Sequence, residues 1–146
     1  MRDGHRIFDR LARLSKPTIA VLNGHAFGGG LELAAACDLR VMATGASLAL
    51  PEAGVGIVPG WSGTQRLMRL LPEPMVKEMA LFGGRIKADR ALACGFVAAV
   101  GDDPRALAMA QAYRPSRPTP NSTADSRKGM RQPHSLKASS PIAVRT

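Results

Sequence analysis

The sequence contains few aromatic residues, few cysteines and no long apolar run. Aromatic residues make up 4% of the 146 positions and hydrophobic residues 45%, so a core has to be built mainly from Ala, Leu, Val and Ile. Cys37 and Cys94 belong to no Cys-x-x-Cys pair and have no histidine at metal-ligand spacing. This pattern argues against a zinc site and is typical of free thiols that pack as small hydrophobes in a reducing compartment. We therefore expect a cytoplasmic protein without a bound metal.

A membrane partner is not expected either. A membrane-spanning helix needs about 18 or more consecutive apolar residues, and the sequence contains no such segment. The charged start of the chain, residues 1–6, is followed by no apolar run of the kind that a signal peptide requires.

Positive charge is abundant but unevenly distributed. The net charge is +9, and residues 114–146 contribute +6 of it, with seven basic residues and one acidic residue. This segment also holds five of the 11 prolines, and its apolar residues follow no period. We interpret it as a basic, Pro/Ser-rich disordered tail behind a domain that covers residues 1–113. Such a tail can bind nucleic acid or anionic membrane nonspecifically, but most are simply solvated, and we do not expect a nucleic-acid partner.

Residues 1–113 combine helical and extended patterns. An apolar face on residues 4–14 predicts an amphipathic helix, the β-rich run at 18–22 predicts a buried strand, and 31–37 predicts a helix behind a glycine-rich turn. Prolines and glycines at 51–59 predict a loop. Further helices are predicted at 62–71, 74–82, 88–94 and 104–113, and further extended segments at 39–43, 47–50 and 96–100.

The glycine cluster Gly28-Gly29-Gly30 opens the predicted helix at 31–37. A helix N-terminus presents unpaired N–H groups and a partial positive charge, so glycines there allow an anion, or an oxygen that becomes one during a reaction, to approach closely. The alternative is that the glycines only permit tight packing between strand and helix. The cluster has neither the Gly-Lys-Ser/Thr ending of a P-loop nor a full Gly-x-Gly-x-x-Gly pattern, which argues against a nucleotide-phosphate site.

Two carboxylates stand out because their neighbours carry no charge. Glu32 lies in the first turn of the predicted helix, and Glu52 lies in the loop Pro51-Glu52-Ala53-Gly54. Glu32 can simply complement the helix dipole, and a loop glutamate is usually solvated. If the two segments converge, one acid can act as a base while the other donates a proton. The local pattern leaves this convergence open.

Two longer motifs resemble those of the enoyl-CoA hydratase/isomerase (crotonase) family. Residues 16–34, KPTIAVLNGHAFGGGLELA, are similar to its central motif, and residues 51–60, PEAGVGIVPG, with GTQRL at 63–67, resemble its second motif. The two glutamates stand 20 positions apart, which is similar to a hydratase of the family. The resemblance covers roughly residues 5–110, and it implies an α/β fold with a crotonase-type ββα spiral core that is incomplete in this chain.

The resemblance also implies an activity, which is the addition of water across the 2,3 double bond of an acyl-CoA thioester. The implied catalytic residues are Glu32 and Glu52, which would share one water, and the implied substrate-binding residues are Gly28, Gly29 and Gly60. The N–H of Gly29 would be one oxyanion-hole donor, and the backbone of Gly60 would orient the water. Coenzyme A is part of the substrate, so no separate cofactor is implied.

The sequence departs from the family at both ends. Roughly fifteen residues precede the strand at 18–22, so we expect the early strands of the core, the second oxyanion-hole donor and most of the CoA cleft to be absent, with a sheet edge left uncovered. Residues 114–146 stand where the family has a helical region that supports trimers or hexamers. The family's homo-oligomeric assembly is therefore in question for this chain.

Three hypotheses about function stay open. The chain is an enoyl-CoA hydratase, an isomerase or other thioester-enolate enzyme of the same fold, or a catalytically inactive fragment or basic-tailed binding protein. A family isomerase often keeps only one of the two glutamates, so the presence of both favours hydration.

Overall fold

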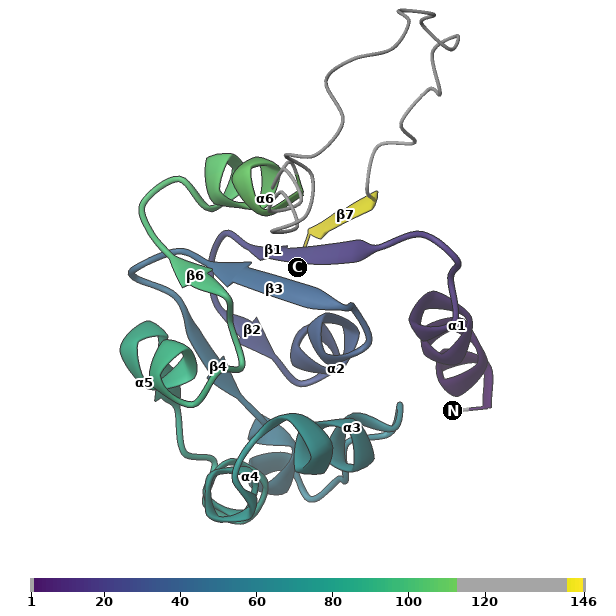
Figure 1. Cartoon of the computed structure of the whole chain (residues 1–146). Coiled ribbons are helices and arrows are strands. Elements are labelled where there is room, and N and C mark those ends of the chain that lie inside the picture. Colours follow the sequence, from purple (N-terminus) through teal and green to yellow (C-terminus); the bar gives the residue numbers. More distant parts are fainter. Residues whose placement is uncertain (1, 113–141, 146) are drawn as a thin grey trace, which may run out of the picture.

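The computed structural model describes residues 2–112 and 142–145, in which two small sheets are enclosed by helices (Figure 1). The helices are α1 (Arg2–Ala12), α2 (Gly29–Ala35), α3 (Gly63–Leu70), α4 (Glu73–Phe82), α5 (Ala88–Ala93) and α6 (Pro104–Ala112), together with the 3-10 helix η1 (Pro51–Val55). The strands are β1 (Thr18–Leu22), β2 (Ala26–Phe27), β3 (Leu39–Met42), β4 (Ser47–Ala49), β5 (Ile86–Lys87), β6 (Ala99–Val100) and β7 (Ile142–Arg145). The architecture is mixed α/β, as the sequence predicts.

The larger sheet has the strand order β6-β3-β1-β7, and all of its pairings are parallel. Every residue of β1 is buried, which is typical of a parallel strand that is covered on both faces. Ala20 and Leu22 belong to the main core, whereas Ile19 and Val21 belong to a second cluster with Ala108 of α6. This alternation follows from the two-residue period of a strand.

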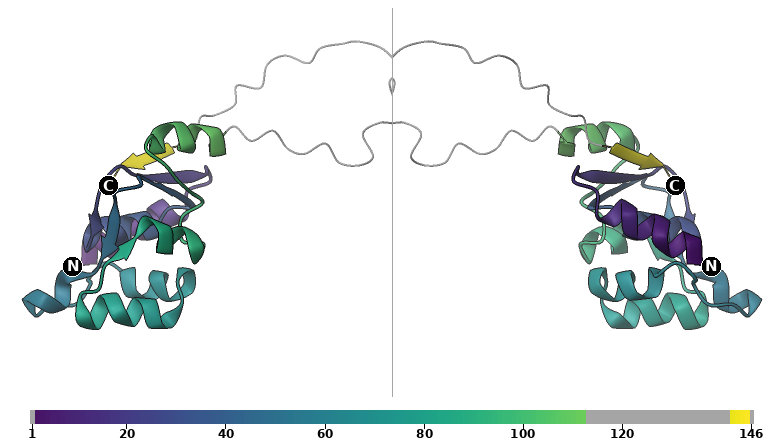
Figure 2. Two further views of the ribbon diagram at one scale, coloured as in Figure 1. Left: turned by 90° about the vertical axis from the view of Figure 1, so that its left-hand side faces the viewer. Right: turned by 90° about the vertical axis from the view of Figure 1, so that its right-hand side faces the viewer.

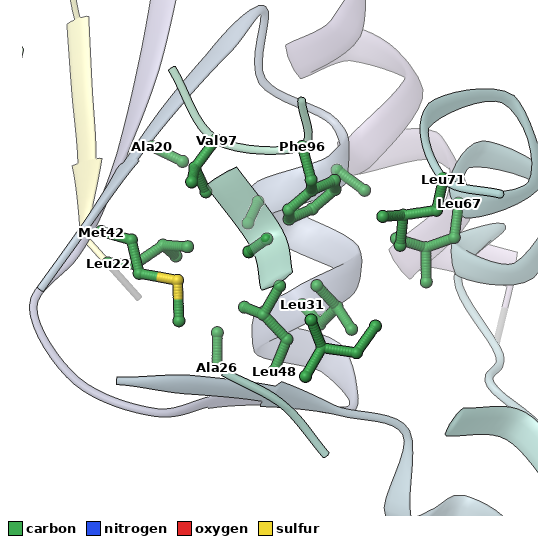
Figure 3. Close-up of a cluster of buried hydrophobic side chains, with 14 of the residues drawn as sticks. Ala20, Leu22, Ala26, Leu31, Met42, Leu48, Leu67, Leu71, Phe96 and Val97 are labelled. Atoms are coloured by element: carbon green, nitrogen blue, oxygen red, sulfur yellow. The ribbon is translucent and has the colours of Figure 1, made fainter. Parts of the chain in front are cut away.

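The smaller sheet, β2-β4-β5, combines one parallel and one antiparallel pairing. The main hydrophobic core fills the space between the two sheets and α2, and it is closed by α3, α4 and α5 (Figure 3). Its side chains are mostly aliphatic, with Phe96 as the aromatic member of the cluster. The core is therefore built in the way that the scarcity of aromatic residues predicts.

The helices divide between the two faces of the larger sheet. Helix α6 covers the outer face, and α2 lies on the inner face between the sheets (Figure 1). Helix α1 stands at one side of the molecule and faces the viewer in the right-hand view of Figure 2. Its side chains contact the turn that precedes α3, and α3 packs on α2. This arrangement brings three helices together at the end of α2 where its first residues lie.

A buried cation links β3, α2 and the segment after α5. Arg40 on β3 is 7% exposed, its Nε donates to the carbonyl of Phe96 at 2.6 Å, and its Nη1 donates to the carbonyl of Cys37 at 2.8 Å. The guanidinium also lies over the Phe96 ring, 4.8 Å from its centroid. Burial lowers the pKa of Arg40, and the carbonyls compensate for the hydration that the charge has lost.

The start of β1 is fixed by a reciprocal contact between Thr18 and Asp38. Asp38 Oδ2 accepts the backbone N–H and the hydroxyl of Thr18, both at 2.7 Å, and Thr18 Oγ1 accepts the N–H of Asp38 at 2.9 Å. The contact stands next to the first paired residues of β1 and β3, Ile19 and Leu39. It therefore helps to set the register of the strand that leads to the glycine cluster.

The structure corrects two expectations about the C-terminal segment. Ile142–Arg145, which the sequence predicts to be disordered as part of 114–146, form β7, and β7 pairs with β1 along the edge that we expect to be uncovered. A sheet edge presents unpaired N–H and C=O groups that an extended segment can satisfy, and β-branched residues such as Ile142 and Val144 favour extended backbone. Residues 113–141 and 146 lie outside the described residues, so the remainder of the tail stays a prediction.

Some elements differ in type or length from the sequence prediction. The Pro/Gly-rich segment 51–59, predicted as a loop, begins with η1, because Pro51 suits the first helical position and Gly56 ends the turn with φ 72°. The strand predicted at 96–100 is reduced to β6, because the N–H groups of its first two residues bond back to α5. Strands β2 and β5 have two residues each, which is too short to produce an alternating pattern.

Truncation after Pro141 would remove β7 and expose the edge of β1. We expect the free energy of unfolding to fall by about 2 kcal/mol, because each ladder hydrogen bond contributes about 0.5–1.5 kcal/mol, and we expect association through the free edge at high concentration. Urea unfolding and size-exclusion chromatography with light scattering measure the two effects. Truncation after Arg145 is the matched control, and identical behaviour of the two shortened chains would contradict the pairing.

Replacement of Arg40 by leucine would leave the carbonyls of Phe96 and Cys37 buried without a donor. We expect a loss of about 3 kcal/mol in the free energy of unfolding, because hydrogen bonds to charged groups contribute about 1.5–3 kcal/mol each. The midpoint of urea unfolding provides the measurement. Arg105→Leu, at an exposed position of α6, serves as the control, and an equal loss in both variants would refute a structural role for Arg40.

Candidate active site

A left-handed glycine turns the chain from β2 into α2. Gly28 has φ 51°, and its N–H donates to the carbonyl of Ala49 on β4 at 3.0 Å. The carbonyl of Gly28 accepts the N–H of Glu32 at 3.0 Å, which begins the helix. Because Gly29 is the first residue of α2, its N–H has no acceptor within the helix. This donor is therefore available to a group that lies in front of α2.

Two of the three glycines are needed for close packing. A Cβ atom on Gly28 would lie 2.5 Å from Glu52 Oε1, and one on Gly29 would lie 2.6 Å from the Trp61 ring, whereas the same position on Gly30 has nothing within 4 Å. The sequence leaves open whether these glycines serve packing or ligand approach. The structure shows close packing at Gly28 and Gly29. The side chains that contact them, the carboxylate of Glu52 and the indole of Trp61, line one pocket.

Glu32 is held by two backbone N–H groups from the turn before α3. The side chain is 2% exposed, and its Oε1 accepts the N–H of Trp61 at 2.9 Å and the N–H of Gly63 at 2.8 Å. A Cβ on Gly63 would collide with the side chain of Glu32. Both donors occupy Oε1, so Oε2 is the carboxylate oxygen that remains for a bound molecule.

Ser62, between the two donors, has an unusual backbone conformation. Its φ is 66°, the one positive φ among the non-glycine residues in the described part of the chain. Left-handed backbone costs a residue with a side chain roughly 1–2 kcal/mol. This conformation lets the N–H groups on either side of Ser62 converge on one anionic oxygen, as in the backbone concavities that bind anions. Strain of this kind is often found at functional sites.

Helix α1 braces this turn from outside. The side chains of His5 and Ser62 form a hydrogen bond. Asp9 pairs with Arg66, whose Nη1 donates to the carbonyl of Trp61 at 3.0 Å. The backbone of Trp61 is therefore bonded on both sides, through its N–H and its carbonyl, and the turn is fixed between α1, α2 and α3.

Glu52 approaches α2 from η1. The carbonyl of Glu52 accepts the N–H of Ile57 at 3.0 Å, which closes the turn and directs the side chain toward Gly28. Oε2 of Glu52 is buried and has no hydrogen-bond partner among residues 2–112 and 142–145. A buried carboxylate oxygen without a partner is costly in the absence of a ligand or water. It is therefore the strongest local sign of a binding function.

One pocket of about 220 Å³ joins these groups. It is lined by Gly29, Glu32, Glu52, Ile57, Val58, Gly60 and Trp61. Four of the five site residues that the sequence predicts are among them, and the fifth, Gly28, lies against the carboxylate of Glu52. The two acids, whose relative position the sequence alone leaves open, face the same space from α2 and from η1.

Sequence reasoning assigns no function to Ser62 or to the apolar pair Ile57 and Val58. The first holds the backbone donors in place, and the pair lines the pocket. A serine-glycine step at the start of the helix predicted at 62–71 is the local signal for the turn, and it does not specify a left-handed serine. Ile57 and Val58 lie in a segment that the sequence predicts as a loop, and nothing in that local sequence indicates that they line a pocket.

Three larger pockets lie elsewhere. One of about 350 Å³ is lined by Phe27, Phe82 and Arg85 among others, and one of about 380 Å³ lies beside His25. Neither of these two is lined by an Asp or Glu side chain, and the third, of about 240 Å³, has a single acid, Asp38, whose Oδ2 accepts two hydrogen bonds from Thr18. Of these pockets the smaller one alone has two acids, so it serves proton-transfer chemistry better. His25 bonds to Ser47 through Nδ1 at 3.0 Å and stacks on Phe27, outside the acid-lined pocket.

The described residues give little support for other kinds of site. Residues 2–112 and 142–145 contain no group of three or more metal-ligating side chains. No helix in the same ranges has the length and apolar character needed to cross a membrane. Cys37 and Cys94 are free thiols, and burial raises the pKa of Cys37.

Comparison with known proteins gives relatives that are named as an acyl-CoA hydratase and an acyl-CoA dehydratase. The chain is 48% identical over 94 residues to a short-chain-enoyl-CoA hydratase of Clostridium acetobutylicum. This match covers 64% of the chain and 36% of the relative. It is 54% identical over 91 residues to a carnitinyl-CoA dehydratase of Salmonella typhi, and this match covers 62% of the chain and 33% of the relative. The chain thus spans about a third of the length of these curated relatives.

Solved structures show the same similarity in three dimensions. The structure of Pseudomonas aeruginosa DspI matches with a TM-score of 0.73 and 41% identity over 75% of this chain and 46% of that one. An enoyl-CoA hydratase of Bacillus anthracis matches with a TM-score of 0.67 and 39% identity over 74% and 43%. The fold is therefore of the crotonase type that the sequence predicts.

A sequence model of the family described as enoyl-CoA hydratase/isomerase matches residues 2–115. This range includes both motifs, all five predicted site residues and every helix of the described structure. The match runs over most of the chain, and the protein belongs to the enoyl-CoA hydratase/isomerase family.

Proposed function

We propose that this chain carries the acid–base site of an enoyl-CoA hydratase, which adds water across the 2,3 double bond of an acyl-CoA thioester. The observation that carries the proposal is the shared pocket, in which Glu32 and Glu52 face one space beside the first residue of α2. The relative named as a short-chain-enoyl-CoA hydratase supports the same reaction class.

The thioester oxygen is proposed to lie in front of Gly29. Attack of water on the β-carbon moves electrons toward the carbonyl and creates an enolate, so negative charge grows on that oxygen. The free N–H of Gly29 and the partial positive charge at the start of α2 stabilise this charge more than they stabilise the neutral carbonyl. Loss of one such donor typically raises the barrier by about 3 kcal/mol.

The two carboxylates are proposed to hold one water molecule between them. Glu32 offers Oε2, because Oε1 is occupied by two backbone donors, and Glu52 offers its unpartnered Oε2. One acid removes a proton from the water as its oxygen bonds to the β-carbon, and the other delivers a proton to the α-carbon of the enolate. The backbone of Gly60, on the same pocket, is proposed to orient the water.

Hydration fits this site better than migration of the double bond. Isomerisation moves a proton between two carbons of the substrate, and one carboxylate suffices for that transfer. Hydration requires an activated water and a separate proton delivery, which is the task of two acids with different surroundings. Glu32 is nearly inaccessible and bonded to the backbone, whereas Glu52 is partly buried and has a free oxygen.

The proposal also covers the cofactor requirement, the cellular location and the assembly of the protein. Water addition involves no net oxidation or reduction, so the reaction requires no cofactor beyond the coenzyme A of the substrate. The free thiols of Cys37 and Cys94 support a cytoplasmic location. The apolar end of α4, where Leu81 is 63% and Phe82 84% exposed, supports association with a further protein surface, whereas the trimeric or hexameric assembly of the family stays in question for this chain.

Replacement of Glu52 by glutamine would test the proposed chemistry. The amide can act neither as a general base nor as a general acid near neutral pH, so we expect kcat for hydration of crotonyl-CoA to fall by about 10²–10⁴-fold, measured as loss of the conjugated-thioester absorbance. Glu78→Gln is the control, since Glu78 pairs with Arg90 away from the pocket. An unchanged rate in Glu52→Gln would refute the proposal, and a folded parent chain without activity would support the inactive-fragment hypothesis.

Alanine substitutions at Gly28 and Gly30 would distinguish a glycine that is needed for close packing from one that only lowers the stability of the helix. Gly28→Ala places a methyl group against Glu52 and in left-handed backbone, so we expect it to lose about 1–2 kcal/mol of stability and most of the hydration rate. Gly30→Ala meets open space inside α2 and should gain up to about 1 kcal/mol through helix propensity. Thermal unfolding and the hydration assay provide the measurements. Equal effects at both positions would show that the contact with Glu52 is unimportant.

A further inference from the structure

The indole of Trp61 spans the distance between α1 and α2. A Cβ atom on Gly4 of α1 would collide with the five-membered ring, and one on Gly29 of α2 would lie 2.6 Å from the six-membered ring. The ring of Phe8 packs against the same side chain in a T-shaped arrangement, with ring centroids 5.5 Å apart and planes at 83°. Two helices therefore leave room for this ring only because each has a glycine opposite it.

Both the backbone and the ring of Trp61 have contacts that hold them in place. The backbone of Trp61 donates to Glu32 Oε1 and accepts from Arg66, so both ends of the residue are bonded. The T-shaped contact with Phe8 is a favourable aromatic geometry. The ring cannot swing away from the pocket without losing its contact with Phe8 of α1.

This fixed ring forms one wall of the acid-lined pocket. The pocket measures about 220 Å³, which is below the roughly 300–1,000 Å³ of pockets that enclose larger ligands. Trp61 is the largest side chain that lines it, and at 38% exposure it is the least exposed of the three apolar lining side chains, since Ile57 and Val58 are 57% and 76% exposed. The indole is thus the wall that limits the space beside the two acids.

We infer that Trp61 sets the length of acyl group that the site accepts and restricts it to short chains. This inference rests on the proposed function, because it places the thioester oxygen at Gly29 and the β-carbon between the acids. The six-membered ring lies against Gly29 and lines the same pocket as both acids, so an acyl chain that continues past the acids inside this pocket is proposed to meet the indole. Trp61 is a specificity-determining residue that contacts the acyl group, and it takes no part in proton transfer.

The single tryptophan of the chain allows binding to be measured without turnover. Butyryl-CoA and octanoyl-CoA have no double bond to hydrate, and their binding to the full chain can be followed by Trp61 fluorescence and by calorimetry. We expect butyryl-CoA to bind at least about tenfold more tightly, and to change the emission of Trp61, because misfit of a few methylenes is worth that much. Equal affinity for the two ligands would overturn the inference.

Three variants then test whether the indole of Trp61 causes the preference for butyryl-CoA over octanoyl-CoA. In Trp61→Ala we expect the affinity ratio of butyryl-CoA to octanoyl-CoA to fall to about one, and in Trp61→Phe, which keeps one ring against Phe8, we expect an intermediate ratio. Met68→Ala, at an exposed position of α3, should keep the parent ratio. Calorimetry measures the variants without tryptophan. If Trp61→Ala fails to fold, Trp61→Phe decides, and a parent-like ratio there overturns the inference.

A separate hydration assay with crotonyl-CoA distinguishes failure of this inference from failure of the proposed function. A parent chain that prefers butyryl-CoA but does not hydrate crotonyl-CoA would contradict the proposed activity and retain the role of Trp61. A chain that hydrates crotonyl-CoA and binds both saturated ligands equally would retain the activity and overturn the role of Trp61. A chain that binds neither ligand would overturn both.

Discussion

Two backbone N–H groups that converge on one carboxylate oxygen hold the candidate site together. Oε1 of Glu32 accepts from Trp61 and Gly63, and this pair of bonds ties α2 to the turn before α3. The left-handed Ser62 between the donors is the conformational cost of that arrangement. Without it, Glu32 would be a buried carboxylate without donors, which is among the least favourable arrangements in a protein interior. The position of the indole and the shape of the pocket follow from the same turn.

The surrounding fold serves to place this turn. Strand β2 leads into the left-handed Gly28, α2 begins at Gly29, and η1 brings Glu52 to the same end of the helix. The buried Arg40 secures the opposite end of α2 through the carbonyl of Cys37. The helix is therefore fixed at its C-terminal end by a cation and at its N-terminal end by contacts that form the pocket. A rigid scaffold of this kind is what precise positioning of reacting groups requires.

The sequence predicts the elements whose signal is local. The apolar run of β1, the amphipathic α1 and the good helix formers of α2 are found close to their expected bounds, and the motifs around Glu32 and Glu52 point to the family. Features that depend on distant partners are not predictable in this way. The left-handed backbone of Ser62, the burial of Arg40 and the pairing of β7 with β1 arise from tertiary contacts, which override local preference.

The central claim is that the two acids act as a unit on one water molecule, and a double-mutant cycle tests it most directly. Hydration of crotonyl-CoA would be measured for the parent chain, Glu32→Gln, Glu52→Gln and the double variant. If the acids share one water, removal of the second acid adds little to the loss caused by the first, because groups that act together have strongly non-additive effects. Two losses that multiply in the double variant would show that the acids act independently and would contradict the account.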